Sequence, residues 1–183
     1  MRIAVIGPHS TGKTTFIQDF VTAFPQYTTP SKTYRDAVLE KGLPINQKTG
    51  DQSQGNLLTF LYDQTTTTEG ANVIFDRCVI DNYVYSYCGY LKGNISSELL
   101  VVTKRKMYDS LAHLDCLLFI PTAACVPLTE DNFRDIDLEY TDLINKTFIE
   151  VLFEISSKTH IPIYVVTGNR EERIKHMREK LFS

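Results

Sequence analysis

Short apolar runs alternate along the chain with longer segments whose apolar residues recur at helical spacing. The apolar runs cover residues 2–6, 73–75, 116–120 and 161–166. The helical pattern covers the segment that ends before Pro25, the segment from about 54 to 68, and residues 171–181. Nearly continuous apolar strands that alternate with helices are typical of βαβ units and parallel sheets. The pattern therefore predicts an α/β fold, with a doubly wound parallel sheet that helices cover on both faces.

The composition is that of an ordinary globular protein. The chain has 183 residues, of which 43% are hydrophobic and 22% are charged, and its net charge is -3. This length fits one domain, and no repeat or linker divides residues 1–183. The slight acidic balance disfavours a broadly basic surface that coats nucleic acid. No apolar run approaches the roughly 18 residues that span a bilayer, so we expect a cytoplasmic protein without a membrane partner.

The four cysteines are Cys78, Cys88, Cys116 and Cys125, and they form neither a CxxC pair nor part of a zinc-spaced cluster. We expect reduced thiols, with Cys116 and Cys125 acting as small buried residues.

One motif between the first apolar run and the first helical segment predicts a phosphate site. Gly7, Pro8, His9, Ser10, Thr11, Gly12, Lys13 and Thr14 satisfy G-x-x-x-x-G-K-[ST], the P-loop, and Thr15 follows in the same phosphate-binding set. The glycines let backbone N–H groups point at phosphate oxygens, and the helix start adds its positive dipole end. Lys13 reaches the β and γ phosphates, and Thr14 supplies a hydroxyl to Mg²⁺. His9 occupies a position at which the motif asks for no particular side chain.

A second candidate group follows the next apolar run, where Asp76 and Arg77 stand. The carboxyl end of a strand is where ligands bind in open α/β sheets. Asp76 is therefore expected to hold Mg²⁺ through water or to accept a proton from an attacking hydroxyl, while Arg77 brings charge to substrate or phosphate. Motor ATPases usually have Asp-Glu here, and Asn145-Lys146 lacks the Asp that reads guanine, so both classes are disfavoured. The structural alternative is an Asp and an Arg that only satisfy a loop.

Asp81 and Tyr85 continue this pattern at intervals of four residues after Arg77. On a helix the three side chains share one face, which could meet a phosphate acceptor. Ordinary pairing within the helix is the alternative.

These motifs together resemble the P-loop kinases. More narrowly, they resemble the small AAA-type ATPases and kinases related to the nicotinamide riboside kinase domain of the bacterial NAD-biosynthesis regulator, and phage-encoded kinases. The resemblance rests on residues 7–14, on Phe75-Asp76-Arg77 with Asp81 and Tyr85, on Tyr34 to Gly42, and on Thr167-Gly168-Asn169 followed by Glu172-Arg173.

The resemblance implies further detail. It implies five parallel strands in the order 2-3-1-4-5 and a small helical lid at about 129–140, in which Arg134 closes on the transferred phosphoryl group. It places the stretch from Thr167 to Arg173, with Gly168 and Asn169 as cofactor-binding residues, beside the adenine, and it places Tyr34 and Arg35 on the acceptor side.

We therefore expect transfer of a phosphoryl group from ATP, with Mg²⁺, to a nucleoside or nucleotide, by a monomer or a homodimer. In this scheme Lys13, Asp76 and Arg134 are catalytic, and Tyr34, Arg35, Arg77, Asp81 and Tyr85 contact the substrate. One alternative is a phage-type kinase that phosphorylates 5-hydroxymethyluracil in DNA, for which Lys104, Arg105 and Lys106 form the compact basic cluster. Another is a nucleotide-binding ATPase or regulator that has no phosphate acceptor.

Overall fold

The computed structural model describes residues 1–43, 50–122 and 138–182 of the chain. Four strands lie in this part: β1 (Arg2–Ile6), β2 (Val73–Asp76), β3 (Cys116–Phe119) and β4 (Ile163–Val165). The helices there are α1 (Lys13–Ala23), α2 (Tyr34–Lys41), α3 (Asp51–Thr67), α4 (Val79–Leu91), α5 (Ser97–Leu111), α6 (Leu138–Lys158) and α7 (Arg170–Leu181). The strands and helices that the apolar pattern predicts are all present at these places.

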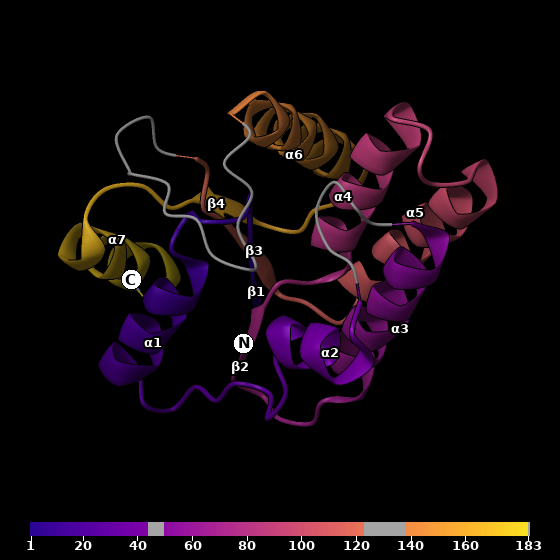
Figure 1. Ribbon diagram of the computed structural model, residues 1–183. Helices are drawn as coiled ribbons and strands as arrows, with labels where there is room; N and C mark the ends of the chain where they lie inside the picture. Colours follow the sequence, from indigo (N-terminus) through magenta and orange to yellow (C-terminus); the bar gives the residue numbers. More distant parts are fainter. Residues whose placement is uncertain (44–49, 123–137, 183) are drawn as a thin grey trace.

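The strands form one parallel sheet in the order β2-β1-β3-β4 (Figure 1). Arg2 pairs with Val73, and Ile3 pairs with Cys116, so the first strand lies between the second and the third. We expected five strands, and the described residues form four. Thr28 makes a single parallel bridge to Val73, because its N–H donates to Asn72 and its carbonyl accepts from Ile74. A bridge therefore lies beside β2, where the order 2-3-1-4-5 has a strand.

Alternate residues of the strands face opposite layers of helices. Ala4 and Ile6 of β1 pack in one buried cluster with residues of α3, α4, α5 and α6, whereas Ile3 and Val5 pack with α1 and α7. Figure 1 shows the sheet between these layers, with α1 and α7 together on one side. Helices on both faces explain why β1, β2 and β3 are almost entirely apolar, since most of their side chains are buried, whereas Val165 of the edge strand β4 is exposed. The doubly wound arrangement is thereby confirmed.

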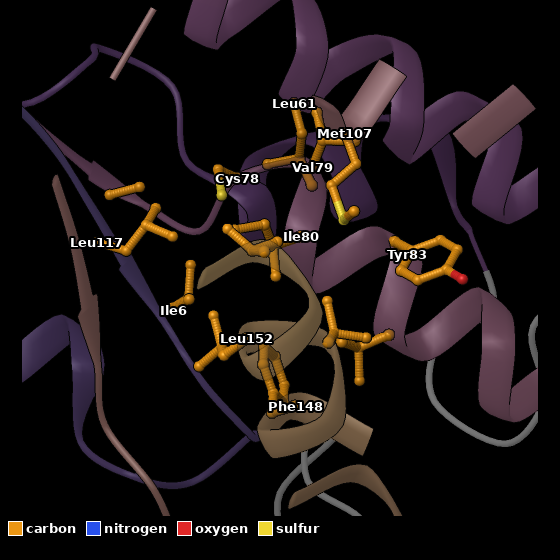
Figure 2. Packing of buried hydrophobic residues seen from close by; sticks show 14 of the residues in the cluster. Ile6, Leu61, Cys78, Val79, Ile80, Tyr83, Met107, Leu117, Phe148 and Leu152 are labelled. Carbon is orange, nitrogen blue, oxygen red and sulfur yellow. The ribbon is translucent and has the colours of Figure 1, made fainter. Parts of the chain in front are cut away.

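The larger cluster lies between the sheet and the helices α4 and α6. Figure 2 shows Ile6 and Leu117 facing Ile80 of α4 and Phe148 and Leu152 of α6. The ring of Phe148 is fully buried, with its centroid 5.7 Å from that of Phe119. Burying each such side chain contributes roughly 1.5–3 kcal/mol. This packing fixes α4 against the carboxyl edge of the strands, where the candidate site lies.

Three cysteines, Cys78, Cys88 and Cys116, are free thiols and are buried, as the sequence predicts for Cys116. Cys125 and Arg134, and most of the expected lid at 129–140, lie outside the described residues. Within the described ranges, no helix is both long enough and apolar enough to cross a bilayer.

Candidate active site

The P-loop, residues 7–14, connects β1 to α1 and takes its shape from three residues in the left-handed region. Gly7 has φ of 144°, Ser10 of 62° and Gly12 of 81°. A β-carbon on Gly7 would lie 2.2 Å from the carbonyl oxygen of Ile120, so the loop passes too close to β3 for any other residue. The motif glycines are therefore required by backbone geometry, as the sequence pattern predicts.

The side chain of Lys13 is turned back into the loop. Its ammonium group donates hydrogen bonds to the carbonyls of Gly7, at 2.8 Å, and of Pro8, and the residue is only 5% exposed. Burial, followed by the positive charge of Arg77, lowers the pKa of Lys13 from 10.5 to about 7. An anion that binds close to Lys13 would therefore strongly stabilise the charged form of its buried ammonium group.

Thr14 and Asp76 meet where α1 starts and β2 ends. The Thr14 hydroxyl donates to Oδ2 of Asp76 at 2.8 Å, although 62 residues separate them. The pair therefore brings a hydroxyl oxygen and a carboxylate oxygen together beside the P-loop, and both are ligand types that Mg²⁺ prefers. Among the described residues, no cluster of three or more His, Cys, Asp or Glu could hold a metal ion.

Arg77 lies between two tyrosines. Its guanidinium carbon lies 4.8 Å from the ring centroid of Tyr34 and 5.8 Å from that of Tyr85, and its Nη1 donates to Asp81 at 3.0 Å. The residue has φ of 78°, which is rare for a side chain larger than asparagine and costs roughly 1–2 kcal/mol. Because α4 begins only at Val79, Arg77 joins the expected face from the preceding loop.

Asp81 is buried beneath this group and is only 2% exposed. One carboxylate oxygen accepts from Arg77 and from the N–H of Gly7, and the other accepts from the N–H of Cys78. Burial raises the pKa of Asp81, while Arg77 opposes that rise. Asp81 therefore links the start of α4 to the P-loop, rather than facing the cleft.

His9 is 4% exposed and contacts α4 and α6. Its N–H donates to the Tyr85 hydroxyl at 3.0 Å, its Nδ1 lies 3.0 Å from the same oxygen, and its Nε2 lies 3.4 Å from the Thr141 hydroxyl. Its ring stacks on that of Tyr140 at 6.5 Å. The sequence motif does not predict these contacts, because their partners lie more than 70 residues away.

The start of α7 approaches the P-loop through Arg173. The Nε of Arg173 donates to the carbonyl of Gly168 at 2.9 Å, and Nη1 donates to that of Thr11 at 3.3 Å. Asn169 caps α7 by accepting from the N–H groups of Glu171 and Glu172. Arg173 ends the stretch that the resemblance places beside the adenine, but its contact with the P-loop was not predicted from the sequence.

A cleft of about 320 Å³ opens among these groups. It is lined by residues 9–15, Gln18, Thr33, Tyr34, Arg35, Asp76, Arg77 and Tyr85. Of the predicted residues in the described part, Gly7, Asp81, Gly168 and Asn169 do not line it. Gln18 and Thr33 were missed, although Gln18 follows Thr14 by one helical turn and Thr33 precedes Tyr34 as the cap of α2. The cleft therefore brings the P-loop, the end of β2 and the start of α2 to one space.

Comparison with known proteins gives a family and a fold. A family model described as an AAA domain, AAA_28, matches residues 2–173. No curated protein matches the chain.

Several solved structures are similar. Deoxyadenosine kinase from M. mycoides with bound dATP has a TM-score of 0.76 and 19% identity, with 100% of both chains covered. The same enzyme with the products dCMP and dCDP has a TM-score of 0.69 and 20% identity, over 99% of this chain and 98% of that one. NadR in complex with NR has a TM-score of 0.71 and 18% identity, over 97% of this chain but only 50% of that one. These structures have the same fold as this chain.

Proposed function

Because the chain belongs to the AAA_28 family of AAA domains and has a nucleoside kinase-like fold, we propose that it transfers a phosphoryl group from ATP to a nucleoside or nucleotide. The observation that carries the proposal is the shared cleft. Residues 9–14 of the P-loop, with Thr15 after them, and the pair of Tyr34 and Arg77 line the same space of about 320 Å³. A donor phosphate on the loop and an acceptor beside the tyrosine would therefore meet without crossing bulk water.

On the donor side, the P-loop supplies N–H groups and one buried cation. When a triphosphate enters, we expect the Lys13 ammonium to leave the carbonyls of Gly7 and Pro8 for phosphate oxygens. The negative charge would restore the protonation of Lys13 that burial disfavours. Lys13 would then stabilise charge on the transferred group, the main task in phosphoryl transfer.

Thr14 and Asp76 are the residues that would hold Mg²⁺. Their oxygens are already adjacent, at 2.8 Å, and both atoms are hard donors that suit this ion. When bound, the ion would neutralise phosphate charge. Asp76 also ends β2 beside Arg77, so its carboxylate can orient an acceptor hydroxyl and take its proton.

On the acceptor side, Arg77 and the exposed Arg35 bring positive charge to the cleft, and Tyr34 brings an aromatic ring. A ring flanked by a guanidinium suits a flat base or a sugar with polar hydroxyls. The dATP, dCMP, dCDP and NR bound in the similar structures belong to this chemical class. Arg134, by resemblance a lid arginine, would add charge from outside the described residues.

The basic cluster that would favour a DNA acceptor is engaged elsewhere. Lys104 pairs with Glu154 at 2.9 Å, and the ammonium of Lys106 lies 3.6 Å from the ring centroid of Tyr62. Both residues belong to α5, which contributes nothing to the lining of the cleft within the described ranges. These contacts favour a small acceptor over DNA.

The test is to incubate the purified protein with Mg²⁺ and γ-labelled ATP in the presence of single candidate acceptors. The panel contains nucleosides, nucleoside monophosphates, nicotinamide riboside, plain DNA and DNA with 5-hydroxymethyluracil. Label on one small molecule supports the proposal and names the acceptor. Label on modified DNA alone, or release only as inorganic phosphate, contradicts it. Asp76→Asn serves as the control variant, because the amide keeps the shape of the side chain but removes the negative charge that would hold Mg²⁺ and take the acceptor proton.

A further inference from the structure

The Tyr85 hydroxyl makes contacts that acceptor binding does not explain. It accepts the main-chain N–H of His9 at 3.0 Å, and His9 is the third residue of the P-loop. A main-chain contact of this kind fixes where the loop runs, whatever side chain stands at that position. Because α4 is buried along most of its length and Tyr85 itself packs in the core cluster, Tyr85 offers the loop a rigid anchor.

The imidazole of His9 extends this contact to a second helix. Burial raises the pKa of Tyr85, so its hydroxyl keeps its proton. The hydroxyl oxygen lies 3.0 Å from Nδ1 of His9 and also 3.0 Å from the main-chain nitrogen of His9. Nε2 of His9 lies 3.4 Å from the hydroxyl of Thr141 at the start of α6. His9 thus links the loop to two helices.

The ring of the same tyrosine faces the other half of the cleft. The guanidinium carbon of Arg77 lies 5.8 Å from its centroid and 4.8 Å from the ring centroid of Tyr34. Tyr85 therefore touches the loop through its oxygen and touches Arg77 through its ring. Figure 1 shows how α4, which carries this residue, reaches from the helical layer toward the end of the sheet.

We propose that Tyr85 is a positioning residue for both substrates: its hydroxyl sets the P-loop at His9, and its ring holds Arg77 for the acceptor. The role of Tyr85 in acceptor binding rests on the proposed function. Its role at the P-loop requires only that the protein binds a nucleotide. In this proposal His9, at a position where the motif asks for no particular side chain, donates its main-chain N–H to Tyr85. The two halves of the cleft are thereby set by one rigid side chain.

Two substitutions separate the two tasks. Tyr85→Phe removes the hydroxyl and keeps the ring, so we expect the Kd of Mg-ADP and the KM of ATP to rise about tenfold, the value of one buried hydrogen bond. The KM of the acceptor should stay within about twofold, because a phenyl ring still faces Arg77. Tyr85→Leu removes both, so the acceptor KM should rise as well, by about fivefold, the value of one cation–π contact.

Tyr108→Phe is the matched control. Tyr108 also donates its hydroxyl, to Glu154 at 3.0 Å, but it lies on α5 away from the cleft. Both Phe variants should lose similar thermal stability, whereas only Tyr85→Phe should weaken Mg-ADP. A purely structural role for Tyr85 would lower the melting temperature without this difference.

The outcomes keep the two proposals apart. If Tyr85→Phe binds Mg-ADP as tightly as Tyr108→Phe does, the positioning role is wrong. A wild-type protein that binds Mg-ADP but labels no acceptor contradicts the transferase proposal, while the binding comparison still decides the donor half. A wild-type protein that does not bind Mg-ADP overturns both. Acceptor kinetics use the nucleoside that the label panel identifies, with deoxyadenosine as the first probe.

Discussion

Arg77 and Asp81 form a buried ion pair at 3.0 Å, directly beneath the P-loop. Their side chains are 14% and 2% exposed, and the same carboxylate oxygen also accepts the N–H of Gly7. The left-handed backbone of Arg77 directs its side chain back over the first turn of α4, where Asp81 stands. Strain, ion pair and loop contact therefore depend on one another, and a change in one is expected to be felt in all three.

Asp81→Asn should destabilise the protein by about 3–5 kcal/mol, because it leaves the charge of Arg77 buried without a partner. Urea unfolding at pH 7 measures the change. The double variant Arg77→Met with Asp81→Asn should recover part of this loss, since no unpaired charge remains, but should not recover acceptor binding. If Asp81→Asn were as stable as the wild type, the stability of the protein would not depend on the ion pair between Arg77 and Asp81.

Lys13 should take up a proton when nucleotide binds. Its pKa of about 7 leaves it mostly neutral at pH 8, and phosphate charge in the loop raises that pKa. Calorimetric titration with Mg-ADP at pH 8 in two buffers of different ionisation enthalpy should show uptake of nearly one proton. Lys13→Met, titrated at higher nucleotide concentration, should show none. If the enthalpy of Mg-ADP binding to the wild type were the same in both buffers, the lowered pKa of Lys13 would be contradicted.

Gly7→Ala should be more damaging than an alanine at another left-handed glycine. The new β-carbon would lie 2.2 Å from the Ile120 carbonyl, and Ile120 cannot retreat without losing its hydrogen bond to Ile6. We expect a loss of about 3 kcal/mol in unfolding free energy, from backbone strain plus overpacking. Gly93→Ala, with φ of 77° and open space around it, is the control and should cost about 1 kcal/mol. Equal losses in the two variants would refute the close contact.

Glu154 should make stability depend on acidic pH. Its hydrogen bond from Lys158, with those from Lys104 and Tyr108, lowers its pKa from 4.5 to about 2. Between pH 2 and pH 4.5 the carboxyl group of Glu154 is protonated more often in the unfolded chain than in the folded protein. Its contribution to the free energy of unfolding is therefore fully present above pH 4.5 and is lost as the pH falls toward 2. Glu154→Gln should therefore lower the unfolding free energy by about 1 kcal/mol at pH 7 and make no difference near pH 2.

The exposed Glu150 on the same helix provides the comparison for that series. Glu150→Gln removes an exposed carboxylate that makes none of the three hydrogen bonds of Glu154, and its unfolding free energy is measured beside that of Glu154→Gln at each pH. If the difference in unfolding free energy between Glu154→Gln and the wild type stayed constant from pH 7 to pH 2.5, the hydrogen bonds to Glu154 would not lower its pKa.

Much of the fold follows from patterns that are local in the sequence. Apolar runs bounded by turns predict the four strands, and the P-loop glycines predict a strand-to-helix turn whose left-handed angles the structure contains. The resemblance to P-loop kinases, and not the apolar pattern, led us to expect a fifth strand. At Thr28 the described chain makes one bridge to Val73 instead, and no apolar run marks that place. Strand order and edge pairing depend on partners far along the chain, so periodicity does not specify them.

The chemistry of the site divides in the same way. Residues 7–14 carry their own shape, because the angles and the N–H groups that make a phosphate nest lie within one short segment. The pairing of Thr14 with Asp76, the burial of Asp81, and the contact between His9 and Tyr85 join segments that are 62 to 76 residues apart. Whether a carboxylate faces a cleft or lies beneath a loop depends on which surfaces the core brings together and which groups lose water there. Those are properties of the packed molecule, and the order of residues alone does not contain them.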